Sequence, residues 1–401
     1  MPDCYITIIG GGIIGNAVAY ELSQIVGNQV ICVLDKNPNF PGENQTARSS
    51  EVVHAGIYYD KAHSPLKARL CVEGNKLIYE FCRRYGLPIR QTGKIIVATN
   101  QEEDRSLDEL LYRARENEVP GVEKIGVDRI RELEPNVKSY SALWVPTSGI
   151  LDSTSLVCKL RDLSNLGDLY LLGTELKNIV VENGEFLIKA NTKGVGENEF
   201  TTKYVINAAG LYSDEIARMV NPNFPLRIFP VRGEAVKFYQ TREDIRVSRN
   251  VYPSPIFYDK PDGTRHLTVG VHLTPRFAMG RDGNFLFENG DFVLGKEITV
   301  GPLNRKKGDE IGKEDFGSDL APISVFLENI KEYFPGVSID DLQLHQTGIQ
   351  AVLANSQDFH IARDELHPNM INLVGICSPG LTSSLAIAKR VREIIKNSER
   401  F

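Results

Sequence analysis

The chain has 401 residues, which is too long for one small hydrophobic core and fits two lobes or one lobe with an insertion. Hydrophobic residues make up 42% of the chain and charged residues 24%, as in ordinary globular proteins, so disordered and fibrous classes are excluded. The formal net charge is −6 and the Lys and Arg residues are scattered, so no nucleic-acid partner is expected.

The start of the chain and its cysteines indicate a cytoplasmic protein. No basic segment followed by an apolar run and a cleavage site stands at the start, so we expect no signal peptide. No run reaches the roughly 18 apolar residues that a membrane-spanning helix needs. The six cysteines form no C-x-x-C pair and no His/Cys cluster with zinc spacing, so we expect reduced thiols and no metal site.

Hydrophobic periodicity predicts a βαβ unit at the start, followed mainly by helices. The elements expected in the first part of the chain are a strand at 4–10, a helix at 13–26, a strand at 29–34, a helix at 66–85, a strand at 92–99 and helices at 101–118 and 152–163. Asp152 or Ser153 is the expected N-cap of the last helix.

Turn signals and two-residue alternation dominate the middle of the chain. Asn183-Gly184 predicts a hairpin within 169–190. The other expectations are a strand at 203–209, single strands such as "HLTVGVHLT" within 221–341, loops or an insertion at 281–318, a strand at 369–377 and a helix at 381–396.

This order of elements predicts an α/β fold, α+β overall, with a Rossmann-like cofactor domain and a β-rich substrate domain. Because the first and last βα units both have nucleotide-binding character, the cofactor domain is expected to be discontinuous. We expect it at 1–90, 151–220 and 341–401, with the substrate domain at 91–150 and 221–340.

Gly10, Gly12 and Gly15 form a G-x-G-x-x-G motif between the first strand and its helix. The first glycine permits a tight turn, the second lets the backbone approach a pyrophosphate, and the third allows close packing of helix and strand. Asp35 ends the next strand, where an acidic residue binds the ribose of a dinucleotide. Together they predict a dinucleotide site.

The C-terminal region favours FAD over NAD. The segment 375–384, "GICSPGLTSS", provides a second turn that leads into a helix, whose N-terminus can face the electron-rich edge of a flavin. There is no second G-x-G-x-x-G, which disfavours a reductase that carries FAD and NAD(P)H in separate units.

Many short motifs resemble one known family. In order they are "IIGGGIIG", "VLDKN", "SSEVVHAGIYY", "LKARLCVEGNKLIYEFC", "TGKIIVA", "ELEP", "SGILD", "VINAAGLYSD", "PVRGE", "NVYPSP", "GVHLTPR" and "SPGLTSS". They resemble the FAD-dependent D-amino-acid-oxidase-like superfamily, and within it the L-2-hydroxyglutarate dehydrogenase/oxidase family. The resemblance implies a FAD-binding domain of glutathione-reductase type and oxidation of a 2-hydroxy acid, L-2-hydroxyglutarate above all, to the 2-oxo acid.

The chain departs from that family at two positions. Glu51 stands where the family has a small residue or glycine, and "ARSSEVVHAG" resembles FAD-dependent glycerol-3-phosphate dehydrogenases. Gln350 stands where the family commonly has an arginine. The alternatives are therefore a flavin enzyme acting on glycerol 3-phosphate or on an amine or amino acid, and a FAD-binding protein without activity.

Oxidation of an alcohol needs a group that takes the hydroxyl proton, and a histidine with a pKa of about 6.5 suits this task. His54 and His272 are the candidate catalytic residues. A covalent bond between His54 and the flavin, as in some amine-oxidising relatives, is a further alternative. Carboxylate binding favours arginine. The candidate substrate contacts are Arg276, Arg232, Tyr58, Tyr252 and Lys94.

The resemblance also implies further contacts with FAD. The complete set of expected cofactor residues is Gly10, Gly12, Ile14, Gly15, Asp35, Lys36, Arg48, Ser49, Ser50, Gly56, Leu176, Ala209, Gly210, Gly348, Gly380, Leu381, Thr382 and Ser383. The expected partners are a small-molecule substrate and an electron acceptor, which is oxygen, a quinone or a protein. A quinone acceptor would require peripheral contact with a membrane.

Overall fold

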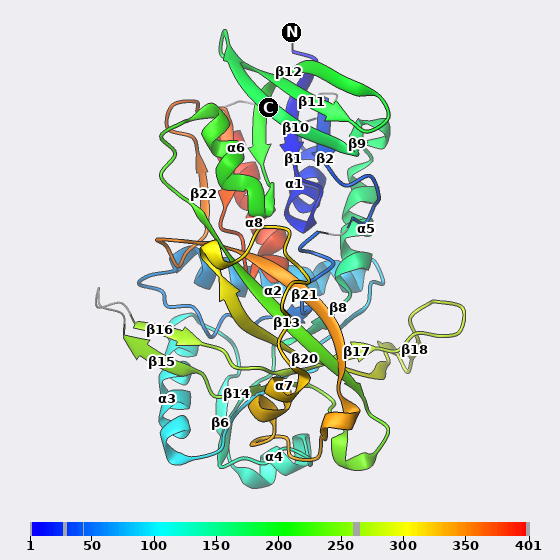
Figure 1. Ribbon diagram of the computed structural model, residues 1–401, viewed down its shortest axis with the longest axis vertical. Helices are drawn as coiled ribbons and strands as arrows, with labels where there is room; N and C mark the ends of the chain where they lie inside the picture. Colours follow the sequence, from blue (N-terminus) through cyan, green and yellow to red (C-terminus); the bar gives the residue numbers. More distant parts are fainter. Residues whose placement is uncertain (1, 27–29, 43, 260–264, 398–401) are drawn as a thin grey trace.

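The computed structural model describes residues 2–26, 30–42, 44–259 and 265–397. It shows two lobes, one above the other in Figure 1, each built around an eight-stranded sheet. Both lobes contain strands and helices, so the mixed α/β class predicted from the sequence is confirmed.

The sheet of the first lobe carries the predicted βαβ unit. Its strands are β1 (Cys4–Ile9), β2 (Ile31–Asp35), β9 (Tyr170–Leu172), β10 (Thr174–Glu182), β11 (Glu185–Thr192), β12 (Gly196–Asn207), β22 (His360–Arg363) and β23 (Met370–Val374). They follow the order β10-β11-β12-β1-β2-β9, and β23 pairs with β12 and β22. β1 is parallel to β2 and β12, and β12 is parallel to β23, so their carboxyl ends lie at one edge.

The helices of the first lobe cover this sheet. They are α1 (Ile13–Ser23), α2 (Pro65–Arg84), α5 (Ser153–Ser164), α6 (Ser213–Val220) and α8 (Gly380–Lys396). α1 packs against α5 and α8, and α2 packs against α8 (Figure 1). Ile6 and Ile8 of β1 are fully buried in the core between sheet and helices. This packing holds the carboxyl edge of the sheet rigidly.

The second lobe is built on a mostly antiparallel sheet. In spatial order its strands are β21 (Gln343–Leu353), β13 (Ile228–Tyr239), β20 (Leu294–Lys307), β17 (Leu273–Phe277), β14 (Asn250–Pro253), β5 (Lys94–Ala98), β7 (Ser141–Val145) and β6 (Glu123–Ile125). Its helices are α3 (Gln101–Glu116), α4 (Val127–Leu133) and α7 (Ile323–Ile330). The long strands β13 and β21 cross the middle of the molecule in Figure 1 and bring this sheet against the first lobe.

Smaller elements complete the described chain. A three-stranded sheet joins β3 (Val52–Val53), β8 (Gly149–Leu151) and β4 (Ile89–Arg90), and two hairpins pair β15 (Ile256–Asp259) with β16 (Arg265–Thr268) and β18 (Phe287–Glu288) with β19 (Asp291–Phe292). The 3-10 turns are η1 (Gly167–Leu169), η2 (Gly210–Tyr212), η3 (Glu243–Ile245), η4 (Gly308–Glu310) and η5 (Ile339–Asp341).

Three expectations about elements differ from the structure. The stretch "HLTVGVHLT" is divided between β16 and β17, because Gly270 passes so close to Pro253 that a Cβ would lie 2.6 Å from its ring. Within 281–318, where we expected loops, β20 forms an interior strand of the second sheet. β21 pairs with β13, so 343–353 belongs to the second sheet although 341–401 was assigned to the cofactor domain.

Within the described ranges, no helix is both long enough and apolar enough to cross a membrane. The six cysteines are all free thiols, and Cys71 and Cys82 are buried in α2.

Candidate active site

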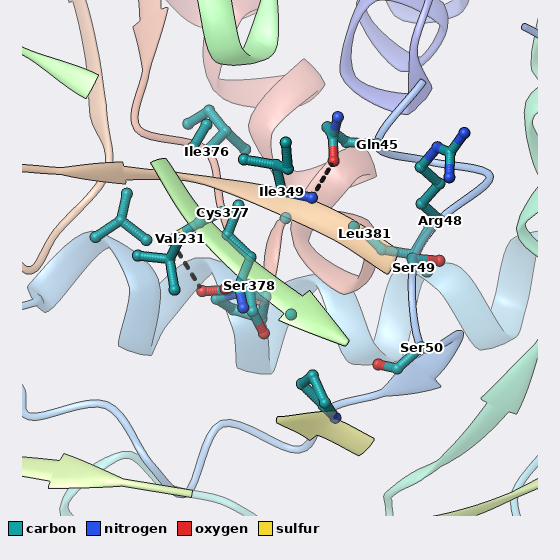
Figure 2. Close-up of a pocket in the computed structure, with 18 of the residues that line it drawn as sticks. Gln45, Arg48, Ser49, Ser50, Val231, Ile349, Ile376, Cys377, Ser378 and Leu381 are labelled. Carbon is teal, nitrogen blue, oxygen red and sulfur yellow. Dashed lines mark hydrogen bonds between the residues drawn. The ribbon is translucent and has the colours of Figure 1, made fainter. Parts of the chain in front are cut away.

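A cavity of about 2330 Å³ extends from the carboxyl edge of the first sheet to the second sheet. Pockets for small ligands usually measure about 300–1,000 Å³, so this cavity can hold a dinucleotide and a substrate together. Figure 2 shows Arg48, Ser49 and Ser50 following one another along one side and Ile376, Cys377 and Ser378 descending on the other. The crevice at the carboxyl ends of parallel strands is where open α/β sheets bind ligands.

The glycine-rich turn after β1 has the geometry that its motif predicts. Gly10 has a φ of +106°, and a Cβ there would lie 2.4 Å from the Ala208 carbonyl oxygen. A Cβ on Gly15 would lie 1.8 Å from the Gly10 oxygen, so only glycine lets α1 approach β1 this closely. The N-cap of α1 is Gly12, whose lack of a side chain leaves the N-terminus of the helix open toward an anion.

Asp35 lies beside this turn. One carboxylate oxygen accepts a hydrogen bond from the Gly11 N–H at 2.7 Å, and the other accepts one from the Asn37 N–H at 2.8 Å. Burial raises the pKa of Asp35, while these two backbone N–H groups counteract that rise. The carboxylate lines the cavity at the end of β2, as required of a ribose-binding acid.

The flavin that the resemblance implies fits this cavity. Gly12 and the N-terminus of α1 line the cavity, where a Cβ on Gly12 would meet only the Thr46 hydroxyl, at 3.4 Å, and the buried Ser49 hydroxyl has no hydrogen-bond partner among the described residues. Unpaired buried hydroxyls are costly, so a bound group with phosphate or hydroxyl oxygens is expected here. Gly10, Gly12, Asp35 and Ser49 are therefore the residues that would hold FAD.

Most of the expected cofactor residues line the cavity. These are Gly10, Gly12, Ile14, Asp35, Lys36, Arg48, Ser49, Ser50, Leu176, Ala209, Gly210, Gly348, Gly380 and Leu381. Gly15, Gly56, Thr382 and Ser383 lie behind its wall. Gly56 faces Val72 of α2, and the Thr382 hydroxyl accepts a hydrogen bond from the His54 N–H at 3.0 Å.

Glu51 has a backbone conformation that is uncommon for a residue other than glycine. Its φ is +60°, in the left-handed region that favours glycine. Its carboxylate accepts hydrogen bonds from the Ser153 N–H at 2.9 Å and hydroxyl at 2.8 Å, and it pairs with Arg276 of β17. Burial raises the pKa of Glu51, and the Arg276 charge counteracts this. The side chain thus ties the start of α5 to the second lobe.

Arg276 is consequently committed to this pair rather than to the cavity. Its Nε also donates to the Thr299 hydroxyl at 2.9 Å, and Arg276 does not line the cavity. We expect Arg276→Leu to destabilise the protein, with a coupling free energy of about 1–3 kcal/mol in a double-mutant cycle with Glu51→Gln. Urea unfolding of the four proteins measures this coupling, and purely additive losses would contradict the pairing.

Arg232 is likewise not available to a substrate. It is fully buried and donates to the Glu234 carboxylate at 2.8 and 3.1 Å, and Asp315 lies 3.2 Å away. The expectation of a substrate contact does not agree with this position, because two carboxylates already neutralise the guanidinium behind the cavity wall.

His54 is held at a fixed position by its backbone. Thr382 accepts from its N–H, and its carbonyl accepts a hydrogen bond from the Asn75 side chain at 2.8 Å. The ring faces the cavity, with Nε2 lying 3.4 Å from the Ser378 hydroxyl. This arrangement presents an imidazole to a ligand without any need for the chain to move.

Four polar side chains gather at this end of the cavity. His54, His272, Tyr58 and Tyr252 all line it, and the Nδ1 atoms of both histidines and both tyrosine hydroxyls are buried without a hydrogen-bond partner in the described structure. The rings of Tyr252 and His272 lie 3.8 Å apart, and those of Tyr58 and Tyr252 lie 6.3 Å apart. Such a group of unpaired atoms indicates a site for a polar ligand.

Lys94 lies behind these rings, outside the cavity lining. Its ammonium is 3.8 Å from the centre of the Tyr252 ring and 5.3 Å from that of Tyr58. Burial lowers the pKa of Lys94 to about 7. Burial also lowers the pKa of His54 and His272 well below the usual value, and the Lys94 charge lowers both further. Both imidazoles are therefore neutral at pH 7 and able to accept a proton.

Thr46, Lys67 and Ser378 are among the polar residues of the wall that were not predicted as site residues from the sequence. The Thr46 hydroxyl accepts from the Ile13 N–H at 2.9 Å, at the start of α1. Lys67 lies in the first turn of α2, where a basic residue opposes the helix dipole. That unfavourable placement was the signal in the sequence that could have identified it.

Comparison with known proteins gives one consistent result. The chain matches the family model of FAD-dependent oxidoreductases over residues 6–394. It is 30% identical to L-2-hydroxyglutarate dehydrogenase of Indibacter alkaliphilus over 98% of both chains, and 31% identical to the mitochondrial L-2-hydroxyglutarate dehydrogenase of Arabidopsis thaliana over 96% of this chain and 82% of that one.

The fold also matches solved structures. The dithionite-reduced L-α-glycerophosphate oxidase from Mycoplasma pneumoniae with FAD bound superposes with a TM-score of 0.80 at 23% identity. The match covers 98% of this chain and 94% of that one.

Proposed function

Because the chain belongs to the family of FAD-dependent oxidoreductases, we propose that it oxidises a small 2-hydroxy acid to the 2-oxo acid, with L-2-hydroxyglutarate as its substrate. One observation carries this proposal. Two neutral histidines and two unpaired tyrosine hydroxyls face the same cavity as the dinucleotide turn. A substrate with a carboxylate and a hydroxyl on adjacent carbons can satisfy all four groups.

The reaction breaks the C–H bond of carbon 2 and the O–H bond of the hydroxyl that this carbon carries. When bound, FAD supplies the hydride acceptor for the hydrogen on carbon 2 and its two electrons. The O–H bond breaks as well, and the proton passes to the imidazole of His54 while the C=O bond forms. His272 orients the hydroxyl. Tyr58 and Tyr252 donate hydrogen bonds to the adjacent carboxylate, in place of the arginines that we had expected.

Glycerol 3-phosphate, or an amine or amino acid, is the alternative substrate. Gln350 lines the cavity, so the position where related sequences commonly have an arginine provides no cation here. Spectroscopy separates these activities. We expect FAD absorbance at about 450 nm, and we expect L-2-hydroxyglutarate to bleach this flavin band under anaerobic conditions. Bleaching by glycerol 3-phosphate or an amino acid alone would refute the proposed substrate.

We further propose a cytoplasmic enzyme whose flavin is reoxidised by oxygen, a quinone or a protein. The six free thiols support this location. The first sheet and its helices would form the cofactor domain, and the second sheet, including β21, the substrate domain. Stopped-flow reoxidation with oxygen and with a soluble quinone compares two of the acceptors directly.

Replacing Lys94 should change the pH dependence of the reaction. Below pH 7 Lys94 carries a charge that lowers the pKa of His54 and His272, so Lys94→Met should raise both values. The base must be unprotonated, so the acidic limb of the pH profile of flavin reduction should move to higher pH by roughly one unit. An unchanged limb would show that neither histidine is the titrating base.

A further inference from the structure

Lys67 is a cation of the cavity wall that has no role in the proposed reaction. It lies in the first turn of α2, it is 9% exposed, and it lines the cavity. Its ammonium donates a hydrogen bond to the Cys377 sulfur at 3.3 Å and lies 5.2 Å from the centre of the Phe359 ring. A thiol is a weak hydrogen-bond acceptor, so the ammonium keeps most of its capacity to donate hydrogen bonds to a ligand.

The charge of Lys67 has no acidic partner in the part of the chain that the structure describes. Asp358 lies beside this turn, but its carboxylate accepts hydrogen bonds from the N–H groups of Leu66 and Lys67 at 2.9 and 2.8 Å and forms no ion pair with the ammonium. Arg113, which also lines the cavity, pairs with Glu109 at 3.1 Å. Lys67 is therefore a wall cation that has no carboxylate partner among the described residues and can bind an external anion.

The position of Lys67 relative to His54 defines what that anion can be. Cys377, whose sulfur accepts the hydrogen bond from Lys67, precedes Ser378, whose hydroxyl lies 3.4 Å from Nε2 of His54. Tyr252 and His272 lie at the inner end, where they are 1% and 4% exposed. On the Lys67 side the cavity opens past partly exposed residues such as Asp60 and His63. A ligand whose reacting carbon meets His54 thus extends its far end toward Lys67.

We propose that Lys67 binds the distal carboxylate of a 2-hydroxy dicarboxylic acid and so selects dicarboxylates over monocarboxylates. This inference rests on the proposed oxidation of a 2-hydroxy acid and assigns its substrate specificity. The inner carboxylate, common to all 2-hydroxy acids, is bound by the neutral tyrosine hydroxyls. The distal one forms a charge-assisted hydrogen bond with the ammonium at the outer end.

Two substrates of equal chain length test this assignment. L-2-Hydroxyglutarate and L-2-hydroxypentanoate differ only in the distal carboxylate. Lys67→Met keeps the apolar stem of the side chain against Phe359 and removes the charge. We expect kcat/KM for L-2-hydroxyglutarate to fall about 10- to 100-fold, mainly through KM, since a hydrogen bond to a charged group is lost. The value for L-2-hydroxypentanoate should stay within about twofold of the wild-type value.

Lys76→Met is the matched control, because Lys76 is an exposed lysine of the same helix. Lys67→Arg, which keeps the charge, should recover part of the preference for the dicarboxylate. FAD absorbance and the unfolding midpoint report whether each variant is folded. Equal losses with both acids, or no loss with either, would overturn the role of Lys67. A wild-type flavin that L-2-hydroxyglutarate does not bleach would instead overturn the proposed function itself.

Discussion

His54→Asn should lower the rate constant of anaerobic flavin reduction by about 10²–10⁴-fold, the usual contribution of a positioned base. Asparagine cannot accept the hydroxyl proton, whereas it can keep the backbone hydrogen bonds to Thr382 and Asn75 that fix this position. Stopped-flow absorbance in the flavin band measures the rate directly. The acidic limb of the pH profile should disappear, because the titrating group is absent.

His272→Asn is the informative comparison. His272 lies beside Tyr252 and orients the substrate in our assignment. Replacing His272 should therefore reduce the rate constant of flavin reduction less than replacing His54 does. If the larger loss and the loss of the pH limb both followed His272→Asn, the base would be His272. FAD content should be unchanged in both variants, because neither histidine belongs to the dinucleotide turn.

Arg232→Met should destabilise the folded enzyme by about 3–5 kcal/mol, the typical result of removing one partner from a buried ion pair. Glu234 would remain, 3% exposed, with its nearest other cation, Arg305, 3.8 Å away. The Arg232 guanidinium also donates to the Asp319 carbonyl at 3.2 Å, so the segment before α7 would loosen too. Urea unfolding of the holoenzyme measures the loss.

Arg232→Met with Glu234→Gln tests the cause. The glutamine oxygen can still accept the hydrogen bond that Ala321 N–H gives to Glu234 at 2.6 Å, while the unpaired charge is removed. Most of the lost stability should therefore return in the double variant. The KM for substrate should be normal in any folded variant, because Arg232 lies outside the cavity. A raised KM with unchanged stability would restore our original expectation of a substrate contact.

Local patterns predicted the glycine-rich turn and the FAD-dependent family. The βαβ unit, Gly10, Gly12 and Gly15, and Asp35 lie within the first 35 residues, and each depends on backbone geometry that the nearby sequence sets. The FAD-dependent family and the α/β class were predicted from these motifs and are confirmed. The individual roles of the site residues remain predictions.

Long-range pairing could not be predicted in the same way. A sequence shows that Arg232 and Arg276 are charged but not that Glu234 and Glu51 neutralise them. The polar stretch 281–318 was expected to form loops or an insertion, but it contains β20, with Pro302 inside the strand. Pro302 is tolerated because the pairing of β13 with β20 shifts register there, so the missing N–H leaves no gap in a regular ladder.

The Glu51–Arg276 pair also sets an order on sequence change in this lineage. The two positions are 225 residues apart. A lineage that lost Arg276 first would carry a buried carboxylate held only by Ser153, whereas one that lost Glu51 first would keep an arginine still bound to Thr299. A glycine at position 51 would relieve the left-handed backbone as well. Descendants are therefore expected to change position 51 before position 276.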